Sequence, residues 1–310
     1  MALCSNVSVA RTYNYNFIFA IDPQPDTPTR KTTRMKHHSE KFLANDHLIF
    51  CQRWQPDSAP KGVLLIAHGL AEHSGRYTEV AEFFVAHNYA VCCLDHIGHG
   101  QSEGQRGFIN RFTDYTDTLD VFATHVSQWY PGLPVFLVGH SMGGLISALF
   151  LIQNQSRFAG SILSGPAIKV SDEPSWLLLM VGRLLSALAP KTGIMQLAAD
   201  NISRDPAVVA AYLNDSMVHT GKISARLATE MLSSMKHVQA NASAITLPML
   251  LLHGSEDQLA APESSSLLHE KIASADKQLV IYQGLYHEIF NEPEKQQVFT
   301  AMLEWLEKRC

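Results

Sequence analysis

Short apolar runs alternate along this chain with longer segments in which apolar residues recur at helical spacing. The runs at residues 62–67 and 89–94 are apolar at nearly every position, which is typical of strands buried on both faces of a parallel sheet. Further runs of this kind occupy residues 135–138, 159–163, 248–252 and 278–282. Helical spacing marks residues 76–87, 112–129, 263–272 and 294–308. This alternation predicts an α/β fold with a mainly parallel central sheet and helices on both faces.

A hairpin is expected ahead of the parallel part of the sheet. The stretches at residues 40–43 and 48–54 read as strands, and Asn45 and Asp46 lie between them. Asn and Asp favour turns because their short side chains hydrogen-bond the nearby backbone. We therefore predict that the two stretches pair with each other.

The alternation is interrupted at about residues 166–237, which we interpret as an inserted helical cap. Its most apolar part, residues 175–189, is bounded by prolines and carries Arg183 as its single charge. That length is too short to span a bilayer, so the segment is either a core helix or a helix whose apolar face meets lipid. We favour a cap with an apolar mouth, because an insertion has little core of its own to join. Two further helical stretches, residues 206–213 and 223–237, complete the cap.

A Gly-x-Ser-x-Gly sequence, Gly139 to Gly143, stands between a run of strand length and the apolar run at residues 145–152, which has helix length. Strand, tight turn and helix in this order form a nucleophile elbow with Ser141 at its apex. Side chains two residues before and after the serine would collide with neighbouring turns, and glycine removes them. A serine that only joins strand to helix is the alternative, but the order of the flanking runs favours a catalytic one.

An activated serine needs a base that takes its proton and a carboxylate that fixes the tautomer of that base. In this type of fold the groups follow in the order serine, acid, histidine, each on a loop at the carboxyl end of a strand. Asp257 stands just past the run at residues 248–252, and His287 stands just past the run at residues 278–282. The sequence thus predicts a triad of Ser141, Asp257 and His287.

Other carboxylates and histidines fit these roles less well. Glu256 neighbours the predicted acid and points elsewhere, so we interpret it as a solvated loop charge. His269 lies inside a predicted helix and His253 at a strand end, where packing or a turn hydrogen bond is the better interpretation. The remaining histidines, His96 and His99 among them, form no H-E-x-x-H motif, so we expect no metal and no cofactor.

Acyl transfer also needs N–H donors aimed at the developing oxyanion. The residue after the nucleophile, Met142, should supply one backbone N–H. The other should come from the loop after residues 62–67, where Leu70 is the best candidate. These two N–H groups are the predicted oxyanion hole.

Composition narrows the class of protein further. Hydrophobic residues make up 46% of the 310 and charged residues 17%, which describes a globular protein with a sizeable core. A net charge of -5 gives no electrostatic case for binding nucleic acid. The five cysteines form no disulfide framework or metal knuckle, and the adjacent Cys92 and Cys93 read as core residues on opposite faces of a strand. We therefore expect a reducing, cytoplasmic location.

The first 34 residues differ from the rest of the chain. They have little periodicity, three close prolines and a small basic cluster, and their apolar stretch is too short for a signal sequence. We interpret residues 1–34 as a disordered extension, or as sequence ahead of a start at Met35. A single hydrolase domain is expected over residues 35–310, with the cap at about 166–237.

Three segments in this order resemble the monoacylglycerol lipases of the α/β-hydrolase superfamily. They are HGLAEHSGRY at residues 68–77, DHIGHGQSEG at residues 95–104 and GHSMGG at residues 139–144, and the phrase YPGLPVF at residues 130–136 fits as well. The resemblance covers the chain from about Met35 to its end. It implies an α/β-hydrolase fold and hydrolysis of the single ester of a monoacylglycerol, or of a similar single-chain lipid ester, through an acyl-enzyme.

The resemblance also implies roles for cap residues. Tyr212 is similar in position to a cap tyrosine near the glycerol end of the pocket. The apolar helix at residues 175–189, with Leu178 and Leu184, would lie over an acyl channel and make peripheral contact with a membrane. Glu72 and Arg76 would form a supporting pair near the mouth, although an ordinary surface ion pair fits them equally well.

Two other classes of function stay open at this point. The same triad could act on lysophospholipids, short esters or N-terminal peptide bonds. A non-catalytic ligand receptor on the same fold is the second class, but such proteins usually lose a member of the triad, and here all three positions are filled.

Overall fold

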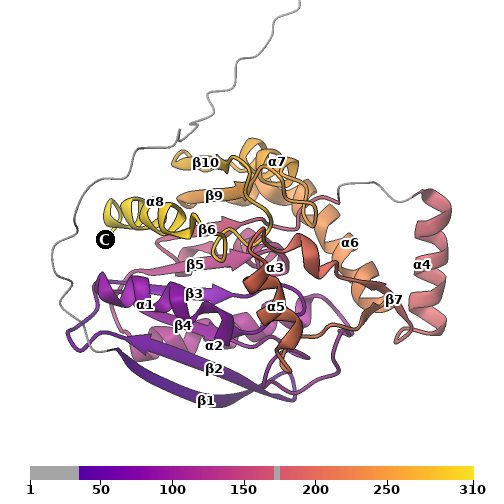
Figure 1. Ribbon diagram of the computed structural model, residues 1–310, viewed down its shortest axis with the longest axis horizontal. Coiled ribbons are helices and arrows are strands. Elements are labelled where there is room, and N and C mark those ends of the chain that lie inside the picture. The colour runs from indigo at the N-terminus through magenta and orange to yellow at the C-terminus, as the bar shows by residue number, and fades with distance from the viewer. Residues whose placement is uncertain (1–34, 171–174) are drawn as a thin grey trace, which may run out of the picture.

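The computed structural model describes residues 35–170 and 175–310, and the extension predicted at residues 1–34 lies outside this part of the chain. Within the described residues, eight strands form one sheet in the order β1-β2-β4-β3-β5-β6-β9-β10 (Figure 1). The strands are β1 (Lys36–Ala44), β2 (His47–Gln55), β3 (Val63–Ala67), β4 (Ala90–Leu94), β5 (Val135–His140), β6 (Gly160–Ser164), β9 (Met249–Gly254) and β10 (Lys277–Tyr282).

The pairing confirms a mainly parallel sheet with an antiparallel edge. β1 pairs with β2, and β2 with β4, in antiparallel register, whereas the neighbours from β4 to β10 are parallel. The predicted hairpin is the β1–β2 pair. Asn45 and Asp46 form its turn with φ angles of 47° and 59°, a left-handed conformation that Asn and Asp tolerate.

Helices cover both faces of the sheet, as the alternation predicted. One face packs against α1 (Thr78–Ala86) and α8 (Lys295–Glu307). The other packs against α2 (Thr113–Trp129), α3 (Met142–Asn154) and α7 (Glu263–Lys271). Cys92 and Cys93 belong to these two opposite cores, as their adjacent places on β4 predicted. Short 3₁₀ turns complete this part: η1 (Ser74–Tyr77), η2 (Gln155–Arg157) and η4 (Ala242–Ala244).

The segment between β6 and β9 is an insertion that departs from the alternation. It contains the helices α4 (Trp176–Leu188), α5 (Pro206–Asn214) and α6 (Ala225–Asn241), the turn η3 (Ala199–Asn201) and the strands β7 (Gly193–Gln196) and β8 (Lys222–Ser224). Each helix begins at a capping side chain, because Ser175, Asp205 and Ser224 accept a hydrogen bond from a backbone N–H of the first turn.

Two features of this insertion differ from the prediction. β7 and β8 pair into a small antiparallel sheet that the sequence did not reveal, because each strand is only three or four residues long. Ile223 and Ser224, which we expected to open a helix, belong to β8, and the helix continues past His237 to Asn241. The three predicted helices of the segment are present. α4 stands apart from the main sheet and packs mainly against α6 (Figure 1).

No helix in the described part of the chain is long and apolar enough to cross a membrane.

Candidate active site

The predicted elbow has the geometry that its spacing demands. β5 ends at His140, Ser141 has φ 53° and ψ -116°, and α3 begins at Met142. A Cβ on Gly143 would stand 2.0 Å from the carbonyl oxygen of Ala67, and one on Gly139 would stand 2.6 Å from that of Gly143. Both glycines are therefore required by close backbone approach, as the sequence predicted.

The predicted acid and base are hydrogen-bonded to each other at the ends of adjacent strands. Asp257 follows β9 and His287 follows β10, and Nδ1 of His287 lies 2.6 Å from Oδ2 of Asp257. Both side chains are buried. The carboxylate accepts, so Nδ1 carries the proton and Nε2 is left free to accept one, which is the tautomer a general base needs.

Electrostatics keep this pair in the state that base catalysis requires. Burial raises the pKa of Asp257, but the positive charge on His287 and hydrogen bonds from His253 and His287 lower it, and the net shift is downward. Burial lowers the pKa of His287, whereas the charge and hydrogen bond of Asp257 raise it, and the net shift is upward. Asp257 thus stays ionised and strengthens the basicity of His287.

Ser141 lies next to this pair. The ring of His140, the residue before the serine, is 4.8 Å from the ring of His287 between centroids. No hydrogen bond joins the Ser141 hydroxyl to His287 within the described residues. Such bonds are often long in the absence of substrate and shorten in the reacting complex. The elbow and the acid–base pair therefore share one edge of the sheet, at the carboxyl ends of β5, β9 and β10.

The predicted oxyanion donors flank the serine. Met142 is the first residue of α3, so its N–H has no partner within the helix. The loop after β3 packs directly on the elbow, since a Cβ on Gly69 would stand 3.3 Å from Cβ of Ser141. Leu70 is the next residue of that loop and is nearly buried. The helix dipole of α3 adds positive potential at the same place.

A buried ion network underlies the site, and it corrects one interpretation. Glu72 and Arg76 are not a surface ion pair, because their side chains are 4% and 11% exposed. Glu72 accepts hydrogen bonds from Gly69 N at 2.5 Å, Tyr77 Oη at 2.8 Å and Arg76 Nη1 at 3.0 Å. Arg76 also donates both terminal nitrogens to Glu288, at 2.6 and 2.7 Å.

Glu288 is a site residue that the sequence analysis missed. Burial raises its pKa, whereas the charge and hydrogen bonds of Arg76 lower it, and the net shift is downward, so it remains a carboxylate. Since Glu288 follows His287 and Glu72 holds Gly69, the network ties the base loop to the loop that carries Leu70. The sequence offered one indication of a role for Glu288, which is its position directly after the predicted base His287.

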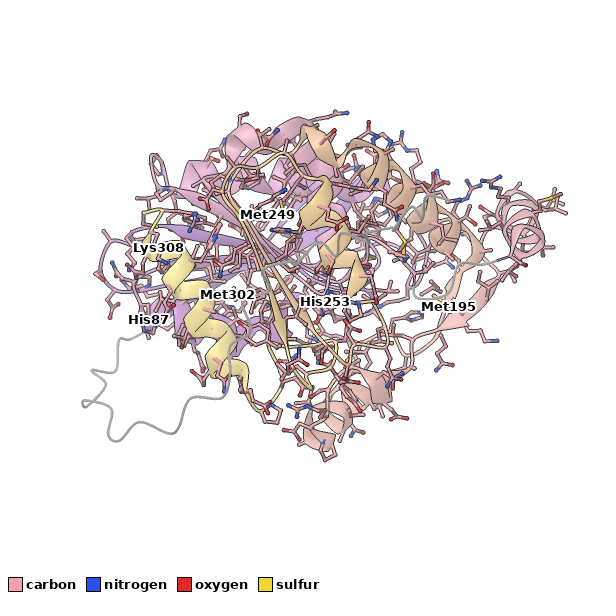
Figure 2. The ribbon with its side chains drawn as sticks, turned by 90° about the horizontal axis from the view of Figure 1, so that it is seen from above. His87, Met195, Met249, His253, Met302 and Lys308 are labelled. Atoms are coloured by element: carbon pink, nitrogen blue, oxygen red, sulfur yellow. The ribbon has the colours of Figure 1, made fainter. Side chains whose placement is uncertain are left out.

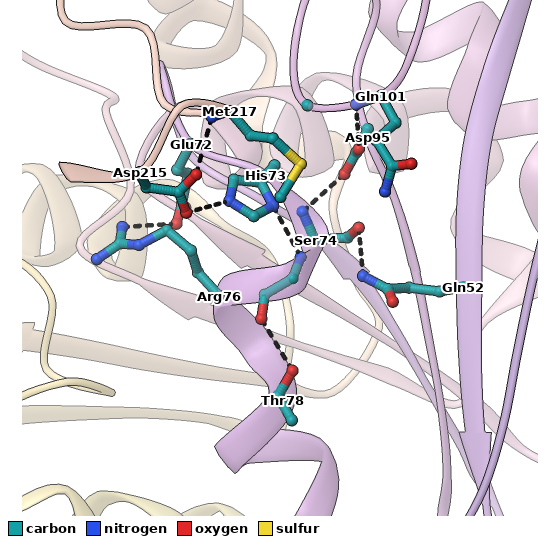
Figure 3. Close-up of polar contacts among 12 residues, drawn as sticks. Gln52, Glu72, His73, Ser74, Arg76, Thr78, Asp95, Gln101, Asp215 and Met217 are labelled. Carbon is teal, nitrogen blue, oxygen red and sulfur yellow. Dashed lines mark hydrogen bonds and ion pairs between the residues drawn. The ribbon is translucent and has the colours of Figure 1, made fainter. Parts of the chain in front are cut away.

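The insertion is attached to this network. Tyr212 on α5 is buried with its ring 4.8 Å from the Arg76 guanidinium. His73 Nε2 lies 2.8 Å from Asp215 Oδ2, and Asp215 also accepts from Met217 N (Figure 3). Residues just after α5 therefore lie over the loop that follows β3.

The other predicted substrate residues lie elsewhere. Leu178 and Leu184 are 61% and 60% exposed on α4, which stands apart from the elbow (Figure 1). The structure thus brings Ser141, Asp257, His287, Leu70 and Met142 into one site with Tyr212 nearby, and leaves the two leucines on an outer helix.

The structure also shows where the alternative candidates for the acid and the base lie. Glu256 is exposed, and within residues 35–170 and 175–310 its carboxylate accepts a single hydrogen bond, from Ser255 Oγ at 3.4 Å. His269 lies on α7, as predicted. His253 makes the expected turn hydrogen bond to Ala260 O, but it also contacts the predicted acid, which the sequence analysis missed. Within the described ranges no group of three or more His, Cys, Asp or Glu side chains could hold a metal ion.

Comparison with known proteins agrees with a serine hydrolase of the α/β-hydrolase fold. Residues 58–294 match the family model Hydrolase_4, described as serine aminopeptidase, S33. The monoacylglycerol lipase of Mycolicibacterium smegmatis is 40% identical over 82% of this chain and 90% of its own length. The monoglyceride lipase of Homo sapiens is 32% identical over 93% of this chain and 96% of its own length.

A solved structure agrees with these relatives. The monoacylglycerol lipase of Paleococcus ferrophilus superposes with a TM-score of 0.75 at 29% identity, over 89% of this chain and 100% of that one. The family match covers the elbow, the acid and the base. The chain therefore belongs to the serine aminopeptidase S33 family and is an α/β-hydrolase of the monoacylglycerol lipase type.

Proposed function

We propose that this protein is a carboxylic-ester hydrolase that cleaves monoacylglycerols to glycerol and free fatty acid. The observation that carries the proposal is the hydrogen-bonded Asp257–His287 pair beside an elbow serine, in a chain whose relatives are named monoacylglycerol lipases. The sequence resemblance supports the same substrate class.

In the proposed reaction Ser141 Oγ attacks the ester carbonyl while its proton passes to Nε2 of His287. Backbone N–H groups of Met142 and Leu70 stabilise the oxyanion of the tetrahedral intermediate. The intermediate breaks the ester C–O bond, and His287 returns the proton to the departing glycerol oxygen. A water molecule, deprotonated by His287, then attacks the acyl carbonyl. The bond from the acyl carbon to Ser141 Oγ breaks, His287 returns the proton to Oγ, and the fatty acid leaves.

The insertion, at about residues 166–237, acts in this proposal as a cap over the site. Tyr212 marks the polar end, where the glycerol would lie, because it packs on Arg76, which is linked through Glu72 to the loop after β3. Leu178 and Leu184 on α4 supply an apolar surface for the acyl chain as it leaves a membrane. The solvent exposure of these two leucines supports this role.

The charges beneath the site favour a neutral headgroup. Arg76 already pairs with both Glu72 and Glu288, so the network carries a net negative charge close to Ser141. A phosphate on the substrate would be repelled by this negative charge, and water screens the repulsion poorly because the carboxylates are buried. A neutral glycerol headgroup avoids that repulsion.

We expect monoolein to be hydrolysed with a kcat/KM about tenfold or more above that of oleoyl lysophosphatidic acid. The acyl chain is the same in both, so the ratio reports the headgroup alone. Fatty-acid release should be measured for these two, for oleoyl lysophosphatidylcholine and for an aminoacyl naphthylamide. Faster turnover of either lysophospholipid would favour a lysophospholipase, and release of the naphthylamine a peptidase.

A peripheral membrane contact through α4 is a separate prediction. Replacing Leu178 and Leu184 with serine should lower binding to phosphatidylcholine liposomes about tenfold or more, because burying a single leucine is worth roughly 1.5–3 kcal/mol. Turnover of a short, soluble ester should change little. Leu43 and Leu48 are also exposed but lie on the β1–β2 hairpin, so the matching double serine variant is the control. Equal liposome binding by the two double variants would contradict a docking role for α4.

A further inference from the structure

The acid of the site is held by a second histidine, His253, in addition to His287. His253 lies on β9, four residues before Asp257, and its side chain is fully buried in the interior of the molecule (Figure 2). Its Nε2 is 3.0 Å from Asp257 Oδ2 and 3.0 Å from the carbonyl oxygen of Ala260. Its Nδ1 is 2.7 Å from Ser265 Oγ on α7.

These contacts are compatible with one neutral tautomer of His253. Nε2 faces two groups that can only accept, a carboxylate oxygen and a carbonyl oxygen, so Nε2 must carry the proton. Nδ1 must then accept, and the Ser265 hydroxyl supplies the donor. Every polar atom of the ring is satisfied in this arrangement, which is what a buried imidazole requires.

His253 completes a set of four donors around the Asp257 carboxylate. Oδ1 accepts from the backbone N–H groups of Leu259 and Ala260, at 2.8 and 2.9 Å. Oδ2 accepts from His287 at 2.6 Å and from His253 at 3.0 Å. Two donors on each oxygen fix the plane of the carboxylate as well as its position. Without His253, the one donor to Oδ2 left among the described residues would be His287, which the carboxylate has to orient.

We propose that His253 is a positioning residue of the catalytic triad. Its Nε2–H holds Oδ2 of Asp257 against Nδ1 of His287, and Ser265 fixes the tautomer that makes this possible. The inference rests on the proposed roles of Asp257 and His287. His253 itself does not reach the reacting atoms and acts through the acid.

Comparison of His253→Leu with His253→Gln tests the proposal. Leucine keeps the bulk and removes the donor, and a hydrogen bond to a charged group is worth about a ten- to hundredfold change in rate, so kcat for a short soluble ester should fall by about that factor. KM should change less than about twofold, since the substrate contacts are untouched. Glutamine places an amide N–H near the position of Nε2–H and should restore most of kcat.

A spectroscopic measurement follows the same hydrogen bond without turnover. The proton between His287 Nδ1 and Asp257 should give a far-downfield resonance in the proton NMR spectrum of the wild type. It should broaden or shift in His253→Leu and return in His253→Gln. A folded His253→Leu variant with wild-type kcat and an unchanged resonance would overturn the proposal, and so would a loss of kcat that glutamine does not restore.

Two adjacent serines on α7 supply a matched pair in case the leucine variant does not fold. Ser265 bonds His253, whereas Ser264, equally buried, bonds the backbone of Lys169 at 3.0 and 3.1 Å. Ser265→Ala should lower kcat several-fold and Ser264→Ala should not, although both lose a buried hydrogen bond and some thermal stability. Equal kcat in the two variants would overturn the proposal. A wild type that hydrolyses no ester would instead refute the proposed function, and the downfield resonance would still report on His253.

Discussion

Replacement of Ser141 with alanine should lower kcat for monoolein hydrolysis by about a millionfold, to the level of the assay background. The reason is chemical, because without Oγ no acyl-enzyme can form and His287 has no proton to accept. The oxyanion donors of Met142 and Leu70 remain in place, so substrate should still bind. Alanine keeps the Cβ of serine, and the positive φ of 53° is no more strained in the variant than in the wild type.

The measurement is fatty-acid release from monoolein, together with labelling by a fluorophosphonate probe. Ser147→Ala is the matched control, since Ser147 lies on α3, the helix that begins directly after Ser141, and its buried hydroxyl has no hydrogen-bond partner among the described residues. That variant should keep wild-type rates and labelling. Hydrolysis by Ser141→Ala at a rate close to wild type would rule out the elbow serine as nucleophile, and a wild type that does not label would revive a non-catalytic receptor.

The fold and the triad could be predicted because their signals are local. The central parallel strands are short apolar runs that are buried along their whole length. The elbow needs glycines at two fixed positions around Ser141, which the 2.0 Å approach of a Gly143 Cβ to the carbonyl oxygen of Ala67 explains. The acid and base could be found because each follows a strand, and parallel strands bring their carboxyl ends to one edge. Residues that follow different strands along the chain therefore lie close together at that edge of the sheet.

The supporting residues could not be predicted, and the physical reason differs from one to the next. Arg76 meets Glu288 across 212 residues, and no spacing rule predicts such a pair. For His253 we predicted packing or a turn hydrogen bond. Its contact with Asp257 was missed because that contact depends on the turn that brings Ala260 and Asp257 back toward β9. The β7–β8 pair was missed for another reason, since strands of three or four residues show no measurable alternation.

Substitution of Asp257 by asparagine should lower kcat/KM by about ten-thousandfold, because the side chain would force His287 into the wrong tautomer. The hydrogen-bond donors around Asp257 determine which way the asparagine amide must point. Four donors face the carboxylate, and the two on Oδ1 are backbone N–H groups of Leu259 and Ala260 that can never accept. The amide oxygen of asparagine must therefore take the Oδ1 position, and its NH₂ group must take the Oδ2 position.

An NH₂ group at the Oδ2 position would face Nδ1 of His287, which must then accept and leave the proton on Nε2. In that state His287 cannot take the proton of Ser141. Loss of the negative charge also removes the main attraction that raises the pKa of His287, so burial would dominate and the pKa would fall. The acid limb of the pH profile, where His287 becomes protonated, should move to lower pH while the maximal rate collapses.

Glu256→Gln is the control for this variant, because it removes the neighbouring carboxylate, which is exposed and accepts a hydrogen bond from Ser255. It should change kcat/KM less than about twofold, as is usual for an exposed charge. Rates should be measured from below the pKa of His287 to well above it, with thermal unfolding to confirm that Asp257→Asn is folded. A large loss in Glu256→Gln beside a small one in Asp257→Asn would reassign the acid. A fall in kcat/KM with the acid limb unmoved would mean that the charge of Asp257 does not set the basicity of His287.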